Sequence, residues 1–244
     1  MDVDKHTQRT VTHVLREAPG RETALLVSGP ERVIEKRFHG GDRLEAWFEL
    51  FHGQLPRSPA QREYAALRTL HEAGLAVPSP ISLASSGRRS SLRMEYVPHS
   101  QTLKDRLAEA GPAERRELGD RLLRMVLRLH GLGWYHRDLY LEHVLLREGT
   151  GELVLIDLGR ARHGNPTRER WFEKDLAALA HSAPPEVGRP ERLRFLCAYL
   201  TGRGVRDRSS RRRFAAATAR RAARMGRHQP RHGVSHPLPS EARA

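Results

Sequence analysis

The sequence predicts an α+β fold in two lobes: an N-terminal lobe with an antiparallel sheet and one helix, and a mostly helical C-terminal lobe. Strand-like segments gather in the first hundred residues, whereas apolar side chains at helical spacing dominate the remainder. The polar stretch PHSQT at residues 98–102 separates the two patterns. We therefore expect lobes at residues 1–100 and 101–232, followed by a flexible tail at residues 233–244.

Three strand patterns define the expected sheet. Residues 23–29 and 32–38, TALLVSG and RVIEKRF, are rich in apolar and β-branched side chains and flank a Gly-Pro pair. This arrangement predicts two antiparallel strands joined by a tight turn. The segment SSLRMEYV at residues 90–97 predicts another strand of the same lobe.

Residues 58–74 predict the helix of the N-terminal lobe. Ser58 is suited to cap its start, Pro59 to occupy its first turn, and Gln61 to complete a capping box. Gly74 follows the last periodic residue and marks the end of the helix.

The C-terminal lobe is expected to be built on a long helix over residues 112–133. Its apolar side chains recur three and four positions apart, which predicts a buried face. That face comprises Leu118, Leu122, Met125, Val126 and Leu129. A shorter helix is predicted at residues 102–110 and a strand at residues 152–157.

Two aspartates follow these elements at positions that suit phosphoryl transfer. Asp138 closes the triplet His-Arg-Asp directly after the long helix, and Asp157 ends the predicted strand. The reaction needs one carboxylate to orient or deprotonate an acceptor hydroxyl and a second to hold a divalent ion on the nucleotide phosphates. His143 lies between them as a possible metal ligand. A simple capped turn is the alternative for the triplet.

Phosphoryl transfer also needs a cation on the donor phosphates. The chain has four lysines, at positions 5, 36, 104 and 174, and Lys36 alone falls on an early strand. A strand lysine of this type is held by a helix glutamate, and Glu63 on the capped helix is placed to serve. An ordinary solvent-facing strand lysine is the alternative.

With these residues in place, the sequence resembles a known family. HRDLYLEHVLL and LVLIDLGRAR, followed by RWFEKDLAALAHSA and LRFLCAYL, are similar to the lipopolysaccharide core kinases. These are the heptose and 3-deoxy-octulosonic acid kinases, which share a protein-kinase-like fold. The resemblance spans roughly residues 20–230, and the motifs around the two aspartates are its most specific part.

The resemblance implies roles for the C-terminal residues. It makes Asp138 the catalytic base and Asp157 the metal-binding aspartate, and it places His143 where ordinary kinases have asparagine. It also makes Asp175 a buried acid that braces the catalytic loop, with an exposed helix acid as the alternative.

In the N-terminal lobe the resemblance makes Lys36 the phosphate-binding lysine and Glu63 its partner. Glu95, in the predicted strand at residues 90–97, is expected among the nucleotide-binding residues together with Lys36 and His143. The implied cofactors are ATP and Mg²⁺, with Mn²⁺ as a further possibility. The implied reaction transfers the γ-phosphoryl group of ATP to a heptose or 3-deoxy-octulosonic acid hydroxyl of the lipopolysaccharide core.

Three departures from ordinary kinases stand out. No G-x-G-x-x-G precedes Lys36, so phosphate cover must come from another loop or be weaker. Magnesium prefers oxygen ligands, so His143 either contacts only phosphate or base, or marks a lost or altered second metal site. No Ala-Pro-Glu segment follows Asp157, which favours a constitutively formed small-substrate or glycolipid site.

Two other functions are considered. Small-molecule phosphotransferases of the antibiotic or choline type usually have glycine between the histidine and the aspartate, and asparagine at the position of His143, so this sequence argues against them. A catalytically silent kinase fold could serve as a basic binding module. Such a module would need neither Lys36 with Glu63 nor Asp138 with Asp157.

Positive charge is concentrated near the C-terminus. The formal net charge is +14, and residues 202–232 hold eleven arginines against one acidic residue. Within this stretch, SSRRRFAAATARRAARM predicts a helix capped by Ser210, with a basic face of Arg213, Arg220, Arg221 and Arg224. Such a face fits a phosphorylated glycolipid in an anionic membrane surface, and nucleic acid is not the expected partner. Arginine-rich composition throughout the chain is the alternative explanation.

The expected location is cytoplasmic, peripheral at the cytoplasmic face of the inner membrane. The N-terminus lacks an apolar stretch of signal-peptide length, and a single cysteine excludes a disulfide framework. Cys197 is expected in the core. The segment LEAWFELFHGQL at residues 44–55, with Trp47, Phe48, Leu50 and Phe51, either dips into the membrane interface or packs under the sheet.

Overall fold

A computed structural model of the chain describes residues 10–40, 57–164, 169–226 and 234–235. The chain forms two compact units, which are described separately. The first comprises Met1–Arg68, Pro78–Pro98 and Arg231–Ala244, and the second comprises Thr69–Val77 and His99–Pro230. The aromatic segment at residues 44–55 lies outside the described residues.

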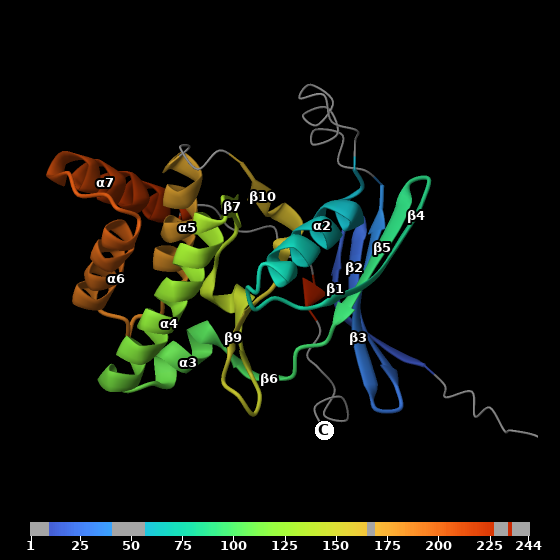
Figure 1. Ribbon diagram of the computed structural model, residues 1–244. Coiled ribbons are helices and arrows are strands. Elements are labelled where there is room, and N and C mark those ends of the chain that lie inside the picture. Colours follow the sequence, from blue (N-terminus) through green and yellow to red (C-terminus); the bar gives the residue numbers. More distant parts are fainter. Residues whose placement is uncertain (1–9, 41–56, 165–168, 227–233, 236–244) are drawn as a thin grey trace, which may run out of the picture. The chain divides into compact units, whose positions relative to one another are not determined.

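The first unit is an antiparallel sheet with the strand order β11-β1-β2-β3-β5-β4 (Figure 1). Its strands are β1 (Val11–Ala18), β2 (Arg21–Ser28), β3 (Glu31–His39), β4 (Pro80–Ser86), β5 (Arg89–Glu95) and β11 (Val234–Ser235). The three strands predicted from sequence correspond to β2, β3 and β5 and are confirmed. Thr23 of β2 pairs with Lys36 of β3, so the register of the central hairpin determines the position of Lys36 in the sheet.

Tight turns join the first three strands. Gly20, between β1 and β2, has φ +73°, and a Cβ at this position would approach the carbonyl oxygen of His39 to 2.9 Å. His39 in turn donates its backbone N–H to the Gly20 carbonyl. Only glycine fits both the left-handed backbone and this close approach.

Helix α2 (Pro59–Glu72) forms with the predicted capping box. The backbone N–H of Ser58 donates to Gln61 Oε1 at 2.7 Å, and the backbone N–H of Gln61 donates to Ser58 Oγ at 3.2 Å. Gly74, with φ +70°, follows the helix as expected.

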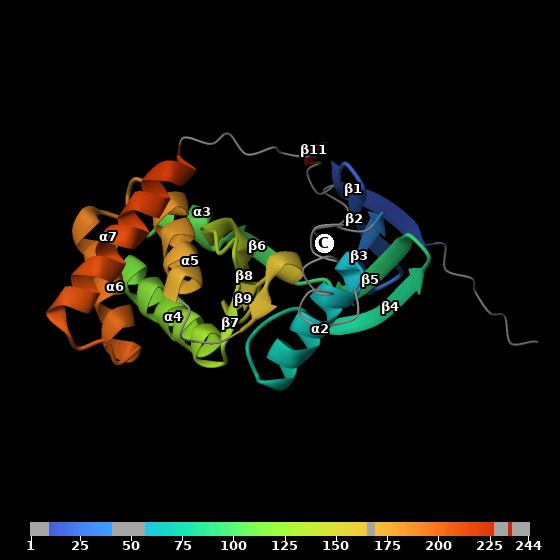
Figure 2. The same cartoon turned by 90° about the horizontal axis from the view of Figure 1, so that it is seen from above.

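The second unit is mostly helical, with a small sheet and a two-stranded ribbon beside the helices (Figure 2). Its helices are α3 (Leu103–Glu109), α4 (Pro112–Gly131), α5 (Glu169–Ser182), α6 (Arg189–Gly202) and α7 (Arg208–Met225). The three-stranded sheet joins β6 (His99–Thr102), β8 (Val144–Arg147) and β9 (Leu153–Leu155). A separate ribbon pairs β7 (Trp134–Tyr135) with β10 (Arg162–His163).

The core of the second unit centres on α4. All five apolar residues predicted for its inner face are buried. Helix α5 packs on α7, and α4 packs on α6. Together with the antiparallel sheet of the first unit, this confirms the predicted α+β class.

Two local predictions are wrong. Cys197 is exposed rather than buried. The buried Tyr199 of α6 lies two residues later, and a helix rotates about 200° over two residues, so Cys197 lies on the opposite side of the helix from Tyr199. Helix α7 is capped by Asp207 rather than Ser210. The Asp207 carboxylate accepts the Ser210 backbone N–H at 2.7 Å and faces the positive end of the helix dipole.

Candidate active site

The loop that carries Asp138 is held in place by hydrogen bonds to Asp175 of α5. This aspartate is completely buried. Its Oδ2 accepts the backbone N–H of His136 at 2.7 Å, and its Oδ1 accepts the backbone N–H of Arg137 at 2.7 Å. The prediction of a buried bracing acid is confirmed, and the exposed alternative is wrong. Two backbone donors compensate the buried charge.

Two non-glycine residues of this region have a left-handed backbone. Arg137 has φ +73° and Asp157 has φ +58°. Such conformations cost of order 1 kcal/mol or more and persist where the surroundings enforce them. The Asp175 bond enforces the one at Arg137, whose guanidinium also lies 5.2 Å from the ring centre of Trp171. Contacts with residues of α5 therefore stabilise the unusual backbone conformation of Arg137.

A buried polar chain extends behind Asp175. His130 Nε2 lies 3.3 Å from Asp175 Oδ2, and His130 Nδ1 lies 2.7 Å from the Tyr199 hydroxyl. Burial lowers the pKa of His130 although Asp175 opposes the shift, and burial raises the pKa of Tyr199. A neutral His130 thus donates to Asp175 and accepts from Tyr199. These two hydrogen bonds hold the Asp175 carboxylate in position.

Ile156 connects the two aspartate-bearing segments. His136 Nε2 donates to the Ile156 carbonyl at 3.0 Å, and the Ile156 backbone N–H donates to the carbonyl of His143 at 2.9 Å. His136 is completely buried, and this burial lowers its pKa, so the neutral ring is the form that bridges. Because Asp157 directly follows Ile156, its position relative to Asp138 is set by backbone bonds.

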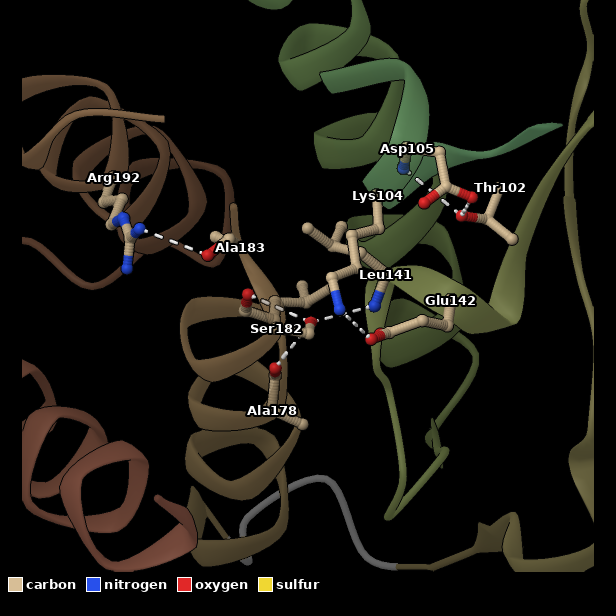
Figure 3. A network of polar contacts seen from close by, with 10 residues as sticks. Thr102, Lys104, Asp105, Leu141, Glu142, Ala178, Ser182, Ala183 and Arg192 are labelled. Atoms are coloured by element: carbon tan, nitrogen blue, oxygen red, sulfur yellow. Dashed lines mark hydrogen bonds and ion pairs between the residues drawn. The ribbon is translucent and has the colours of Figure 1, made fainter. Parts of the chain in front are cut away.

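The far end of the loop is fastened to α5 and α3 (Figure 3). The backbone N–H of Leu141 donates to Ser182 Oγ at 2.9 Å, and that hydroxyl donates to the Ala178 carbonyl at 2.9 Å. Lys104 of α3 pairs with Glu142 at 2.7 Å. Both ends of the loop are thus tied to helices, as a site built for precise positioning requires.

His143 faces Asp157. Its Nδ1 donates to the Asp138 carbonyl at 2.8 Å, and its Nε2 lies 3.9 Å from Asp157 Oδ2. A metal-binding histidine typically donates its other ring N–H to a carbonyl in this way. Among the described residues no cluster of three or more histidine, cysteine or acidic side chains gathers around a common point. A divalent ion held by Asp157 and His143 would need further ligands beyond these two side chains.

In the first unit, Lys36 and Glu63 form a buried ion pair between β3 and α2. Their side chains are 7% and 1% exposed, so the alternative of a solvent-facing lysine is wrong. Glu95 accepts the backbone N–H of Ser79 at 3.0 Å and thereby fastens the segment before β4. Its role toward nucleotide remains a prediction.

A sequence model of the lipopolysaccharide kinase (Kdo/WaaP) family matches residues 5–199. The chain belongs to this family. The lipopolysaccharide core heptose(I) kinase WaaP of Pseudomonas aeruginosa is 31% identical over 207 residues, 77% of this chain and 76% of that protein. The 3-deoxy-D-manno-octulosonic acid kinase of Pasteurella multocida is 32% identical over 136 residues, 52% of this chain and 54% of that protein.

Among solved structures, an aminoglycoside-3'-phosphotransferase of type VIII is similar, with a TM-score of 0.59. The likeness covers 86% of this chain and 93% of that chain at 18% identity, so it shows the fold alone. The protein-kinase-like fold expected for a lipopolysaccharide kinase is thereby confirmed.

Sequence reasoning missed two cations of this lipopolysaccharide kinase. Arg160 Nη1 lies 3.0 and 2.9 Å from the two carboxylate oxygens of Asp138. Lys174 Nζ lies 3.8 Å from Asp138 Oδ1, and burial lowers its pKa although Asp138 opposes the shift. The available signal was position: Arg160 comes three residues after Asp157, and Lys174 directly precedes Asp175.

Proposed function

We propose that the protein is an ATP-dependent kinase that transfers the γ-phosphoryl group to a sugar hydroxyl of the lipopolysaccharide core. The observation that carries this function is the pairing of Asp138 with Asp157 through Ile156, in a chain of this family. Two carboxylates held apart by backbone bonds match the division of labour in phosphoryl transfer. The names of the relatives point to the acceptor.

In this proposal Asp138 is the catalytic base. Its carboxylate orients the acceptor hydroxyl and accepts its proton as the oxygen attacks the γ-phosphorus. The side chain is 20% exposed, so an acceptor can reach it from solvent. Asp175 keeps the loop in place without taking part in the chemistry, because its two oxygens are engaged by backbone N–H groups.

Asp157 and His143 would hold a divalent ion, Mg²⁺ or alternatively Mn²⁺, together with the nucleotide phosphates. When bound, such an ion neutralises charge on the transferred phosphoryl group. Lys36, oriented by Glu63, would bind the donor phosphates, and Glu95 is proposed as a further nucleotide contact. These assignments are supported by the buried ion pair and by the orientation of the His143 ring.

The proposed acceptor is heptose or 3-deoxy-octulosonic acid. We propose that the enzyme acts at the cytoplasmic face of the inner membrane, where the exposed arginines of α7 meet anionic lipid. None of the described helices has both the length and the apolar character needed to span a bilayer.

The test is transfer of radiolabelled phosphate from ATP to core lipopolysaccharide purified from cells that lack the gene. We expect one added phosphate per acceptor, located on a heptose or octulosonic acid by mass spectrometry. ATP binding without transfer to any core acceptor would refute the proposed acceptor. Absence of ATP binding, with salt-dependent binding to duplex DNA instead, would favour the silent basic module.

A further inference from the structure

The carboxylate of Asp138 is surrounded by two cations of different character. Lys174 projects from α5 and its side chain is only 21% exposed. Arg160 belongs to the short 3₁₀ helix Leu158–Arg160, and its side chain is 58% exposed. One cation is therefore enclosed within the unit, whereas the other approaches the base from solvent.

The Arg160 contact competes with the reaction. Its Nη1 donates to both oxygens of Asp138, at 3.0 and 2.9 Å. A general base must meet the hydroxyl it deprotonates at about 2.6–3.2 Å. A guanidinium on both oxygens occupies lone pairs and space that the hydroxyl needs, so release of this contact would favour the reaction. Lys174 stays near the carboxylate at 3.8 Å and can remain its counter-charge after that release.

We propose that Arg160 is the acceptor-recognition residue, whose guanidinium leaves Asp138 for an anionic group of the incoming sugar and so frees the base. This inference rests on the proposed function. It adds the type of acceptor group that Arg160 recognises, which is a carboxylate or a phosphate near the acceptor hydroxyl. A guanidinium matches both anions with paired hydrogen bonds. The Arg160–Asp138 pair is replaced by a pair between Arg160 and the acceptor anion. Binding of that anion therefore supplies the free energy needed to separate Arg160 from Asp138.

The acceptor of a related kinase is a possible source of such an anion. A relative that matches about half of this chain is named for an acidic sugar, 3-deoxy-D-manno-octulosonic acid. A carboxylate next to the reacting hydroxyl would distinguish this sugar from neutral ones. A phosphate already present on the core would present the same chemistry, and the experiment separates the two sources.

The test uses deacylated core oligosaccharide in four forms: intact, methyl-esterified at its carboxylates, dephosphorylated, and treated both ways. Binding is measured by calorimetry, which needs no turnover, and transfer is measured with ATP. For the parent protein, removing the relevant anion should weaken binding about tenfold or more, since a charged hydrogen-bonded contact is lost. Arg160→Gln should bind all four forms with similar, weak affinity.

Arg116→Gln is the matched control, because Arg116 is an exposed arginine of α4 in the same unit. It should keep the discrimination of the parent protein. Hydrolysis of ATP by water should rise in Arg160→Gln, because the base is uncovered, whereas a role of Arg160 in the chemistry itself would lower it.

Three results would overturn the inference. The first is equal binding of intact and doubly treated oligosaccharide by the parent protein. The second is retention of the discrimination in Arg160→Gln, and the third is loss of ATP hydrolysis in that variant with its fold intact by circular dichroism. Failure of the proposed function looks different: the parent protein discriminates the anion in binding but transfers no phosphate.

Discussion

The two sets of candidate catalytic residues are positioned in different ways. In the first unit, Lys36 of β3 forms a buried side-chain ion pair with Glu63 of α2. In the second unit, the loop of Asp138 is held by its backbone N–H groups, which donate to Asp175 and Ser182, and by the His136 side chain, which donates to the Ile156 carbonyl. A side-chain ion pair orients the lysine, whereas hydrogen bonds to the loop itself position the aspartate.

This difference follows from what each residue has to do. A phosphate-binding lysine needs only a counter-charge to orient a long flexible side chain. A base must lie within hydrogen-bond reach of one hydroxyl, so the backbone that carries it has to be fixed. The left-handed conformations of Arg137 and Asp157 show how far the second unit constrains its backbone. We therefore expect substitutions in the two sets to behave differently.

The largest expected effect is that of Asp138→Asn. The amide keeps the shape of the side chain but cannot accept the hydroxyl proton, so kcat should fall roughly a hundredfold to ten-thousandfold. ATP affinity should change little, because the network that holds the loop does not use the Asp138 carboxylate. Measured kcat within about a factor of ten of the parent value would remove Asp138 from the role of base.

The second prediction concerns the buried ion pair of the first unit. Lys36→Met and Glu63→Gln should each destabilise the protein by about 3 kcal/mol, because removing one member leaves a buried charge without its partner. The double variant should regain part of that stability, since neither charge remains. Urea unfolding of the four proteins gives the coupling free energy.

Activity separates the roles of the pair. We expect kcat to fall about a hundredfold in Lys36→Met and in the double variant, because both lack the phosphate cation, and less in Glu63→Gln. If the double variant regained activity along with stability, Lys36 would have no role beyond folding.

Much of this architecture could be predicted from local sequence. The capping box of α2, the inner face of α4 and the glycine turns depend on residues within a few positions of one another, and all were found. The prediction of Ser210 as the cap of α7 failed because Asp207, three positions earlier, is also a residue type that caps helices.

The contacts that complete the site could not be predicted in this way. Arg160 lies 22 residues after Asp138 in sequence, and no periodicity joins them. Lys174 meets the same carboxylate only because α5 carries it there. The roles of the two ring nitrogens of His143 depend on the Asp138 carbonyl, which is a backbone atom and leaves no trace in the sequence.

The third prediction tests the network of the second unit through pH. Burial lowers the pKa of His130 below 6.5. Below about pH 6.5, His130 therefore binds a proton in the unfolded chain but remains neutral in the folded state. The free energy of unfolding should therefore fall with decreasing pH, by up to about 1.4 kcal/mol per pH unit for this group. His136, whose pKa burial also lowers, should add to the loss.

Urea unfolding at about pH 7.5 and about pH 5.5 measures this dependence. His130→Gln should be less stable at the higher pH but should lose less on acidification, because one buried titrating group is gone. His71→Gln, at an exposed position of α2, is the control and should follow the parent protein. Equal pH dependence in all three proteins would show that His130 titrates normally and that the polar chain behind Asp175 does not depend on its neutral form.

The smallest expected effect lies outside both sets, on α7. Arg221 pairs with Glu173 of α5 at 3.2 Å, whereas Arg220 and Arg224 are exposed. A cation near an anionic membrane surface contributes about 1 kcal/mol, so Arg220→Gln with Arg224→Gln should raise the KM for membrane-embedded core glycolipid roughly threefold to tenfold at low salt. The KM for ATP should not change.

Arg221→Gln is the matched control. It should lower the free energy of unfolding by up to about 1 kcal/mol through the lost ion pair, with a smaller effect on the KM for the glycolipid. Unchanged KM in the double variant would make α7 a solvated helix that closes the second unit, and the arginine-rich composition would then need no membrane to explain it.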